Sequence, residues 1–356
     1  MQEDGGCEKM FFLLPSYISD VSDVLIESDW FVHNFNSDSS EDVFNPANYL
    51  KNIEIGGDSY EAVIDLNVYQ FILGIVKDGP SKDKYRLAAA FITFCQIAKI
   101  EINPTYCVYE KYKFEPKNLD EAVDSLKLFN ALNNANNEEL AKYALGYTDK
   151  VTFGYTEAFD RDDISKKLTY YQALTGWKSL YTMMLKIVNI HFDSSITHKK
   201  KLQKFVDWMY FEFRQSLAVV AYAVVLWGRK PVKKLMKYSP CSHSDARKSQ
   251  VVNMTWDMYL VTQFFDKWIK KEATKEIFHV SDDAAFREIL RLAIELQKRL
   301  DFSPVSHIIT DQQCLCLSKL FIEDISLKGK RIYNTDRWGI EYREKQISSL
   351  ELKAYS

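Results

Sequence analysis

A short apolar run that ends on an aspartate constrains the fold of this chain more than any other stretch. Residues 62–64 have the composition of a buried strand, and Asp65 follows them directly. The apolar residues from Val68 to Ile75 then recur at helical spacing. A strand, an acidic residue and a helix in this order place a carboxylate at the carboxyl edge of a parallel sheet, where such sheets bind ligands. Taken alone, the stretch favours a simpler explanation, in which Asp65 caps the helix by accepting its free amide hydrogens.

Length and charge set the broad class. A chain of 356 residues suits two domains, or one domain with a large insertion, and its 47% of hydrophobic residues can fill a packed core. The charge is unevenly spread. Residues 1–60 hold 12 acidic and 2 basic residues, a net charge of −10, whereas residues 199–248 hold 12 basic and 3 acidic residues, a net charge of +9. This asymmetry predicts a basic surface for a polyanion, and an acidic segment that can face it in the same chain or in a partner.

Cysteine usage and apolar runs indicate the compartment. The six cysteines form neither a disulfide framework nor a paired C-x-x-C zinc site, which favours a reducing environment. Cys241 and His243 lie in one turn, but no second pair of ligands occurs at zinc-site spacing. Acidic residues stand where a signal peptide needs basic ones. The longest apolar run, residues 217–227, is shorter than the roughly 20 residues that cross a bilayer. We therefore expect a soluble, cytoplasmic protein.

An α/β pattern occurs in two separated parts of the chain. Residues 117–250 lie between these parts and are helical by periodicity, with no convincing strand. The sequence thus predicts an α/β fold, a parallel sheet flanked by helices, interrupted by a large all-α insertion. The expected strands are 61–65, 100–103, 276–280 and 305–309, and the expected helices are 66–77, 81–98, 119–132, 138–145, 164–190, 199–227, 254–269, 284–300 and 311–321.

The same pattern gives expected domain boundaries. The α/β domain comprises a first part, residues 61–116, and a second part, residues 251–325, on either side of the insertion. An acidic N-terminal extension precedes it and a charged C-terminal extension follows it. These extensions are residues 1–60 and 326–356.

Further acids occupy positions similar to that of Asp65. Glu110 lies about one turn into the helix that follows Pro104, Asp257 lies near the start of a helix, and Asp282 stands at the end of a strand. A charge within apolar sequence costs roughly several kcal/mol to bury unless it has a partner. Convergence on a divalent cation explains these acids together, because Mg²⁺ and Mn²⁺ prefer hard oxygen ligands.

The acids also follow one another in a characteristic order. The segments concerned are Asp65-Leu66-Asn67, Glu110 after Pro104-Thr105, Asp257 in Thr255-Trp256-Asp257, and Ser281-x-Asp283-x-x-Phe286. This order resembles that of the PIN-domain nuclease superfamily, over residues 61–113 and 253–310. The chain departs from that family in the long interval between its second and third acids. That interval leaves Glu157 and Asp160 open as alternatives to Glu110.

The resemblance implies a metal-dependent endonuclease, usually a ribonuclease, with Mg²⁺ or Mn²⁺ as cofactor. The metals would activate water and stabilise charge on the phosphate during an in-line attack. A role as a toxin or defence effector, held in check by a protein partner, is also implied, and assembly with further copies of the chain stays open. The implied site consists of Asp65, Glu110, Asp257 and Asp283 as catalytic metal ligands, Asp282 as a further metal ligand, and Asn67 and Ser281 as supporting residues.

The basic stretch is the expected nucleic-acid surface, for RNA more than for DNA. Its lysines and arginines can contact the phosphate backbone. The aromatic residues interleaved with them, such as Trp208 and Trp227, could stack on unpaired bases. Burial in the core is the favoured explanation for these aromatics. The candidate phosphate contacts are Lys199, Lys200, Lys201, Arg229, Lys230, Lys233, Lys234 and Lys237.

Three rival interpretations compete with the nuclease. A catalytically silent scaffold would keep the fold and bind a protein or RNA, with the acids as caps and surface charges. A nucleotide-binding α/β protein is disfavoured, because neither G-x-x-x-x-G-K nor G-x-G-x-x-G follows any strand. A serine hydrolase is also disfavoured, because no G-x-S-x-G segment occurs in the sequence.

Overall fold

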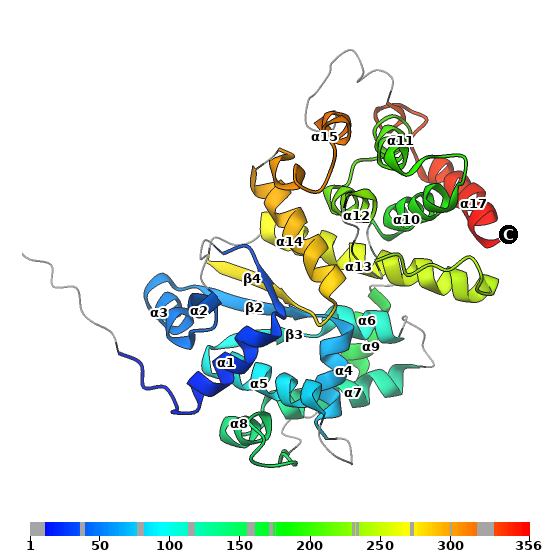
Figure 1. Ribbon diagram of the computed structural model, residues 1–356. Helices are drawn as coiled ribbons and strands as arrows, with labels where there is room; N and C mark the ends of the chain where they lie inside the picture. The colour runs from blue at the N-terminus through cyan, green and yellow to red at the C-terminus, as the bar shows by residue number, and fades with distance from the viewer. Residues whose placement is uncertain are drawn as a thin grey trace, which may run out of the picture. The chain divides into compact units, whose positions relative to one another are not determined.

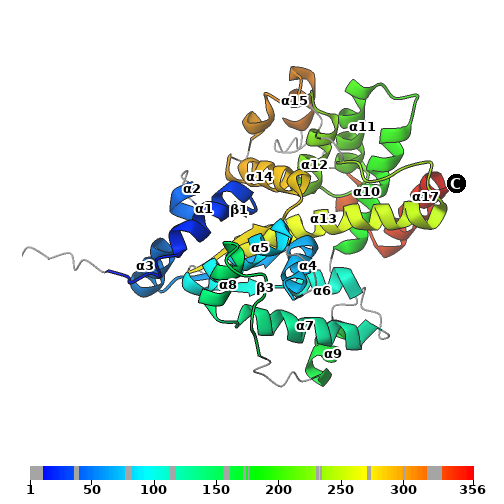
Figure 2. The same ribbon diagram turned by 60° about the horizontal axis from the view of Figure 1, so that its bottom comes forward.

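The chain forms two compact units. Unit 1 comprises Met1–Gln172 and Lys267–Asp282, and unit 2 comprises Ala173–Asp266 and Asp283–Ser356. Figures 1 and 2 show the ribbon from two directions. The computed structural model describes residues 11–35, 40–76, 82–112, 118–154, 161–170, 174, 176–229, 232, 235–270, 274–299, 301–318 and 331–356.

A mixed four-stranded sheet organises unit 1 (Figure 1). The strand order is β1-β4-β2-β3, in which β2 pairs in parallel with β3 and with β4. β1 pairs antiparallel with β4, so the expectation of an all-parallel sheet is wrong at this edge. The additional strand comes from the acidic extension, where Phe31 and Val32 are buried against β4. The strands are β1 (Phe31–His33), β2 (Ser59–Ile64), β3 (Ile100–Asn103) and β4 (Lys275–Val280).

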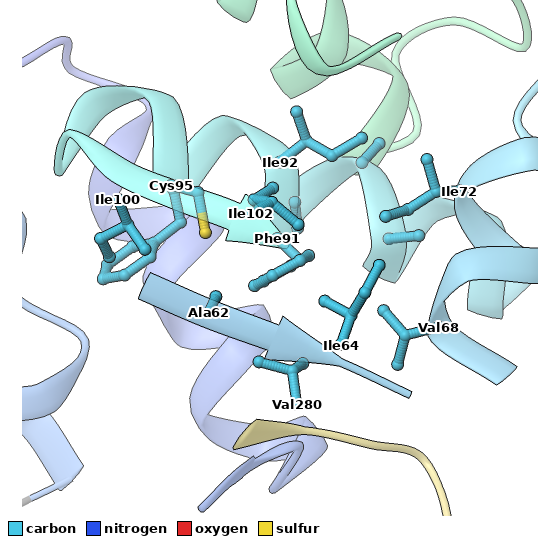
Figure 3. Packing of buried hydrophobic residues seen from close by; sticks show 14 of the residues in the cluster. Ala62, Ile64, Val68, Ile72, Phe91, Ile92, Cys95, Ile100, Ile102 and Val280 are labelled. Atoms are coloured by element: carbon cyan, nitrogen blue, oxygen red, sulfur yellow. The ribbon is translucent and has the colours of Figure 1, made fainter. Parts of the chain in front are cut away.

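The two faces of the central strand β2 differ in chemistry. Ala62 and Ile64 are fully buried and pack toward Phe91 of helix α5 (Asp83–Ile97) (Figure 3). Glu61 alternates with them along the strand, so its side chain points to the opposite face, where it is 4% exposed. It pairs there with Lys267 and with Lys275, whose Nζ lies 2.8 Å from Oε2. Asn103 of β3 donates a further hydrogen bond of 2.8 Å.

His279 of β4 lies on the same face of the sheet and makes stability depend on pH. Its register partner is Val63 of β2, two residues from Glu61. Burial, followed by the nearby Lys267 ammonium, lowers the pKa of His279 to about 3. An unfolded histidine has a pKa of about 6.5, so the unfolded chain binds the proton first as pH falls. His279 therefore contributes its full stability above pH 6.5 and loses it progressively toward pH 3.

We expect the free energy of unfolding to fall by about 2 kcal/mol between pH 7 and pH 5 through His279 alone. Urea unfolding at the two pH values measures this loss. A His279→Gln variant should show a smaller difference between them, whereas His243→Gln should behave as the wild type because His243 is exposed. An equal pH dependence in wild type and His279→Gln would contradict the assignment.

Helix α5 is central among the helices of unit 1. α1 and α8 both pack on α5, and α7 packs on α4 (Figure 2). The helices α7 and α8, which lie in the predicted insertion of residues 117–250, are thus packed within unit 1. The helices are α1 (Ile18–Ser28), α2 (Ser40–Val43), α3 (Pro46–Gly56), α4 (Leu66–Gly74), α5, α6 (Thr105–Tyr112), α7 (Leu119–Asn133), α8 (Asn137–Ala144) and α9 (Arg161–Tyr170).

The described residues of unit 2 contain helices and no strand. Its α12 is buried on all sides and packs on α11 and α14, while α10 packs along α17. Long α13 begins in unit 2 and ends in unit 1. The helices are α10 (Trp177–Phe192), α11 (His198–Phe211), α12 (Leu217–Trp227), α13 (Ser244–Lys270), α14 (Ala284–Arg299), η2 (Ser303–Val305), α15 (Asp311–Ser318), η3 (Ile332–Asn334) and α17 (Ile340–Tyr355).

Three sequence expectations about helices and strands fail. The helix expected over 164–190 is two helices, and Gly176 with φ of +83° precedes the second. The helix expected over 199–227 is also two, because α11 ends at Phe211 and α12 begins after Ser216. The strand expected over 305–309 is wrong: the amides of residues 308 and 309 bond to the carbonyl of Val305, so this segment is a turn.

In the ranges given above, no helix is both long and apolar enough to cross a bilayer.

Candidate functional site

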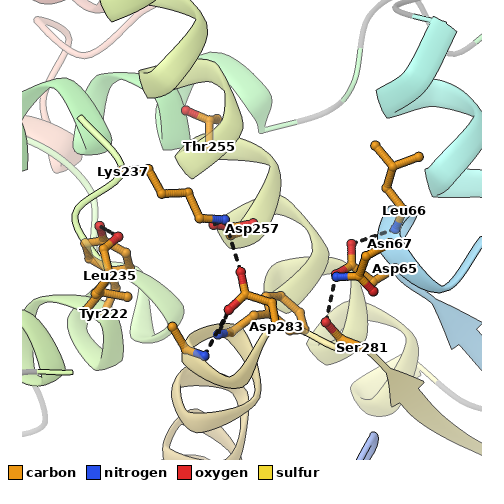
Figure 4. Close-up of polar contacts among 12 residues, drawn as sticks. Asp65, Leu66, Asn67, Tyr222, Leu235, Lys237, Thr255, Asp257, Ser281 and Asp283 are labelled. Atoms are coloured by element: carbon orange, nitrogen blue, oxygen red, sulfur yellow. Dashed lines mark hydrogen bonds and ion pairs between the residues drawn. The ribbon is translucent and has the colours of Figure 1, made fainter. Parts of the chain in front are cut away.

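Asp65 stands at the carboxyl end of β2, where donors from two strand ends converge on it. One carboxylate oxygen, Oδ1, accepts a hydrogen bond of 2.6 Å from the amide of Leu66, so Asp65 does cap α4. The other oxygen, Oδ2, accepts bonds of 2.6 Å from Asn67 Nδ2 and 2.7 Å from Ser281 Oγ (Figure 4). Ser281 directly follows β4, which is parallel to β2. The cap is therefore one part of a larger arrangement that fixes the orientation of the carboxylate.

Asp282 joins this arrangement through three other groups. Its amide donates to Asn67 Oδ1 at 3.1 Å, and its Oδ1 accepts from Trp30 Nε1 at 2.9 Å. The Lys84 ammonium lies 2.6 Å from the same oxygen. Trp30 is fully buried, so its indole N–H needs an acceptor within the protein, and Asp282 provides it.

Glu110 of α6 shares a buried neighbour with Asp65. The Cys107 thiol donates to the carbonyl of Ile64 at 3.0 Å. Burial raises the pKa of this thiol well above its ordinary value, and the charges of Asp65 and Glu110 raise it further. Both charges thus act on the same thiol. In unit 1 hydrogen bonds bring together Asp65, Asn67, Ser281 and Asp282, which we call the edge cluster.

Asp257 and Asp283 lie in unit 2, where Lys237 bridges them. The Lys237 ammonium is 2.7 Å from Asp257 Oδ2 and 3.3 Å from Asp283 Oδ2 (Figure 4). Burial acts to lower the pKa of Lys237, but the two carboxylates outweigh burial and raise it above the ordinary value. Asp283 also caps α14, because its Oδ1 accepts from the amides of Ala285 and Phe286 at 2.9 and 3.1 Å. We call the carboxylates of Asp257 and Asp283, together with the Lys237 ammonium between them, the bridged pair.

Each of these two groups, taken by itself, offers oxygen donors of the kind that divalent cations prefer. The carboxylates offer the hard oxygen ligands that Mg²⁺ and Mn²⁺ prefer, and Asp65 is already oriented. Ammonium groups neutralise Asp257, Asp282 and Asp283, so a divalent cation has to compete with Lys84 and Lys237. Among the residues that the structure describes, no three His, Cys, Asp or Glu side chains are arranged to hold a metal ion.

The basic residues predicted to contact nucleic acid differ in their exposure and in their partners. Lys199, Lys200 and Arg229 are exposed, whereas Lys201 donates to the carbonyl of His191. Lys237, which was predicted to contact phosphate, forms ion pairs with Asp257 and Asp283 of the bridged pair. The interleaved aromatics are buried, which confirms that they belong to the core: these are Trp208, Tyr210, Phe213, Trp227 and Tyr238. The residues Lys230, Lys233, Lys234, Glu157 and Asp160 lie outside the described residues.

The partners of the acids were not evident in the sequence. Lys84 and Trp30 are 198 and 252 residues from Asp282. Lys237 lies in a run of basic residues, which is more typical of a solvated surface. Neither helical nor strand periodicity could have paired these residues with particular carboxylates.

Fold and site together define a class: an α/β protein with oriented carboxylates at the carboxyl edge of parallel strands. No protein-family model, curated protein or solved structure matches the chain.

Proposed function

We propose that the protein is a metal-dependent phosphodiesterase that cleaves nucleic acid, RNA in preference to DNA. The supporting observation is the orientation of Asp65 by Asn67 and Ser281 at the ends of two parallel strands. The sequence resemblance assigns Asn67 the task of orienting this carboxylate, and the 2.6 Å bond between them is consistent with that task. An oriented carboxylate loses less freedom when it binds a cation, which favours binding.

The residues of unit 1 have distinct roles under this proposal. Bound Mg²⁺ or Mn²⁺ would supply the positive charge that activates water and stabilises the phosphate. Asp65 and Glu110 would hold the cation. Asn67 links Asp65 to the backbone of Asp282, since it donates to the first and accepts from the second. This link keeps the ends of β2 and β4 in a fixed relation, so that the carboxylates stay in place through a catalytic cycle.

A metal-dependent change in thermal stability tests the proposal. A ligand that binds the folded state at about 100 times its Kd stabilises that state by about 2.7 kcal/mol. We expect Mn²⁺ to raise the melting temperature of the wild-type protein. The same increase should occur in Asp149→Asn, because Asp149 is exposed and pairs with Arg86. The absence of any increase in the wild type would contradict the proposal.

The silent scaffold is the second candidate, and the lysine contacts are the specific observation that favours it. Lys84 and Lys237 balance Asp282, Asp257 and Asp283 with protein charges alone. Under this interpretation the carboxylates are structural and need no added cation. The chain would then act through binding, to RNA or to a protein.

A Lys237→Met variant separates the two candidates. Removing the ammonium leaves two carboxylates without their shared partner, and we expect a loss of about 1–2 kcal/mol of stability, less than for a fully buried pair because Lys237 is partly exposed. The phosphodiesterase proposal predicts that Mn²⁺ restores this loss, giving a larger increase in melting temperature than in wild type. A destabilised variant with no response to Mn²⁺ would favour the scaffold. The measurement is thermal unfolding with and without Mn²⁺.

A further inference from the structure

Unit 2 contains a cavity of about 600 Å³ that belongs neither to the edge cluster nor to the bridged pair. It is lined by residues of α10, of α11 and of the turn that joins these helices. Three lysines line it, namely Lys186, Lys200 and Lys204, together with Asp207 and Glu212. The volume lies within the range of small-molecule sites in proteins.

Lys186 is half-buried in this cavity, with its ammonium over the Trp208 ring. Its ammonium lies 5.0 Å from the centre of the Trp208 ring. In the part of the chain that the structure describes, no carboxylate forms an ion pair with it. Burial lowers the pKa of Lys186, Glu212 partly reverses that shift, and Lys353 and Lys204 lower the pKa further. A half-buried ammonium with Lys353 and Lys204 nearby gains from an added anion, beyond what the Trp208 ring face and Glu212 supply.

Trp208 provides a second, independent sign of a missing acceptor. Its side chain is 3% exposed and lines the same cavity. Its Nε1 is buried and has no hydrogen-bond acceptor among the described residues. The ring is held by stacking on Phe213, with centroids 4.8 Å apart and planes at 14°. An indole N–H can only donate, so this atom requires an acceptor that the described residues do not supply.

We propose that this cavity binds a small molecule that carries a phosphate monoester and hydroxyl groups, such as a sugar phosphate or a nucleoside monophosphate. The phosphate oxygens would accept from Lys186 and from Lys200 or Lys204, and a shift of the Trp208 ring on binding would let its buried Nε1 donate as well. A dianion with three acceptor oxygens matches several converging donors. Asp207 and Glu212 line the same cavity and can accept hydrogen bonds from hydroxyl groups. This site goes beyond the proposed phosphodiesterase and does not depend on it.

Isothermal titration calorimetry of the 356-residue chain tests the site, in buffer with EDTA so that no divalent metal contributes. The probes are adenosine 5′-monophosphate, ribose 5-phosphate and unphosphorylated adenosine. We expect both phosphorylated probes to bind and adenosine not to bind. Lys186→Met should weaken the binding of both about tenfold or more, as for the loss of a charge-assisted hydrogen bond. Trp208→Phe, which keeps a ring and removes the N–H, should also weaken it.

Lys178→Met is the matched control, because Lys178 lies on the same helix, is exposed and pairs with Glu344 outside the cavity. Its affinities should equal those of the wild type. Asp65→Asn should also bind both probes as the wild type does, which separates this site from the edge cluster. Absence of binding by the wild type, equal binding of adenosine, or unchanged affinity in Lys186→Met would overturn the proposal.

Discussion

Replacement of Asp65 by asparagine is expected to remove metal-dependent RNA cleavage while leaving the fold intact. The amide oxygen of asparagine can still accept the hydrogen bond from Leu66, so the cap of α4 is kept. The negative charge is lost, and a cation loses a ligand. We expect a decrease in cleavage rate of at least about 100-fold, larger than the 10–100-fold typical of groups that only orient a metal ligand. Cleavage of an end-labelled RNA in Mn²⁺ measures the rate.

A companion variant distinguishes holding a cation from orienting its ligand. Asn67→Ala removes the 2.6 Å hydrogen bond to Asp65 but keeps the carboxylate, so its rate should fall by about 10–100-fold. Asp149→Asn serves as the charge-matched control and should cleave at the wild-type rate, since Asp149 is an exposed partner of Arg86. Full activity in a folded Asp65→Asn protein would exclude the edge cluster as the catalytic centre.

The second large effect is expected at Glu61, in the interior of unit 1. Glu61→Gln preserves shape but leaves Lys267 and Lys275 without their shared carboxylate. Breaking a buried ion pair by removing one partner costs about 3–5 kcal/mol. Both lysines are partly exposed, so we expect a smaller loss of about 2–3 kcal/mol. Urea unfolding at pH 7 measures the change in free energy.

The sheet itself supplies the control for this experiment. Glu101 is the register partner of Glu61 on β3, but its side chain is exposed. Glu101→Gln makes the same chemical change on a neighbouring strand and should alter stability by no more than about 0.5 kcal/mol. Equal losses in the two variants would show that the charge of Glu61 has no special role in the core.

Strands could be predicted from the sequence where the pattern of apolar residues matches the burial that the folded protein imposes on them. Residues 100–103 alternate between buried and exposed positions, and the observed strand has the predicted limits. The stretch before Asp65 is apolar because it packs beneath α5, and it forms the central part of β2. The expectation of a mixed helix and strand architecture is therefore confirmed.

The failures occur where distant contacts decide the structure. β1 has three residues and forms because β4 offers a free edge, a fact that local sequence does not encode. Residues 305–309 are apolar enough for a strand, but their amides bond within the same turn and no neighbouring strand is paired with them in the described residues. The same reasoning applies to the site. The acids could be identified from their apolar surroundings, while Lys84, Lys237 and Trp30 meet them only through tertiary folding.

The position of β4 has a consequence for biosynthesis. β4 lies between β1 and β2, yet it is the last of the four strands to leave the ribosome. Until it emerges, β1 lacks its pairing partner and one edge of β2 stays open, and open edges readily pair with other chains. A nascent polypeptide that stalls before residue 275 would therefore expose two unprotected strands, and chaperone binding during translation would be most useful in that interval.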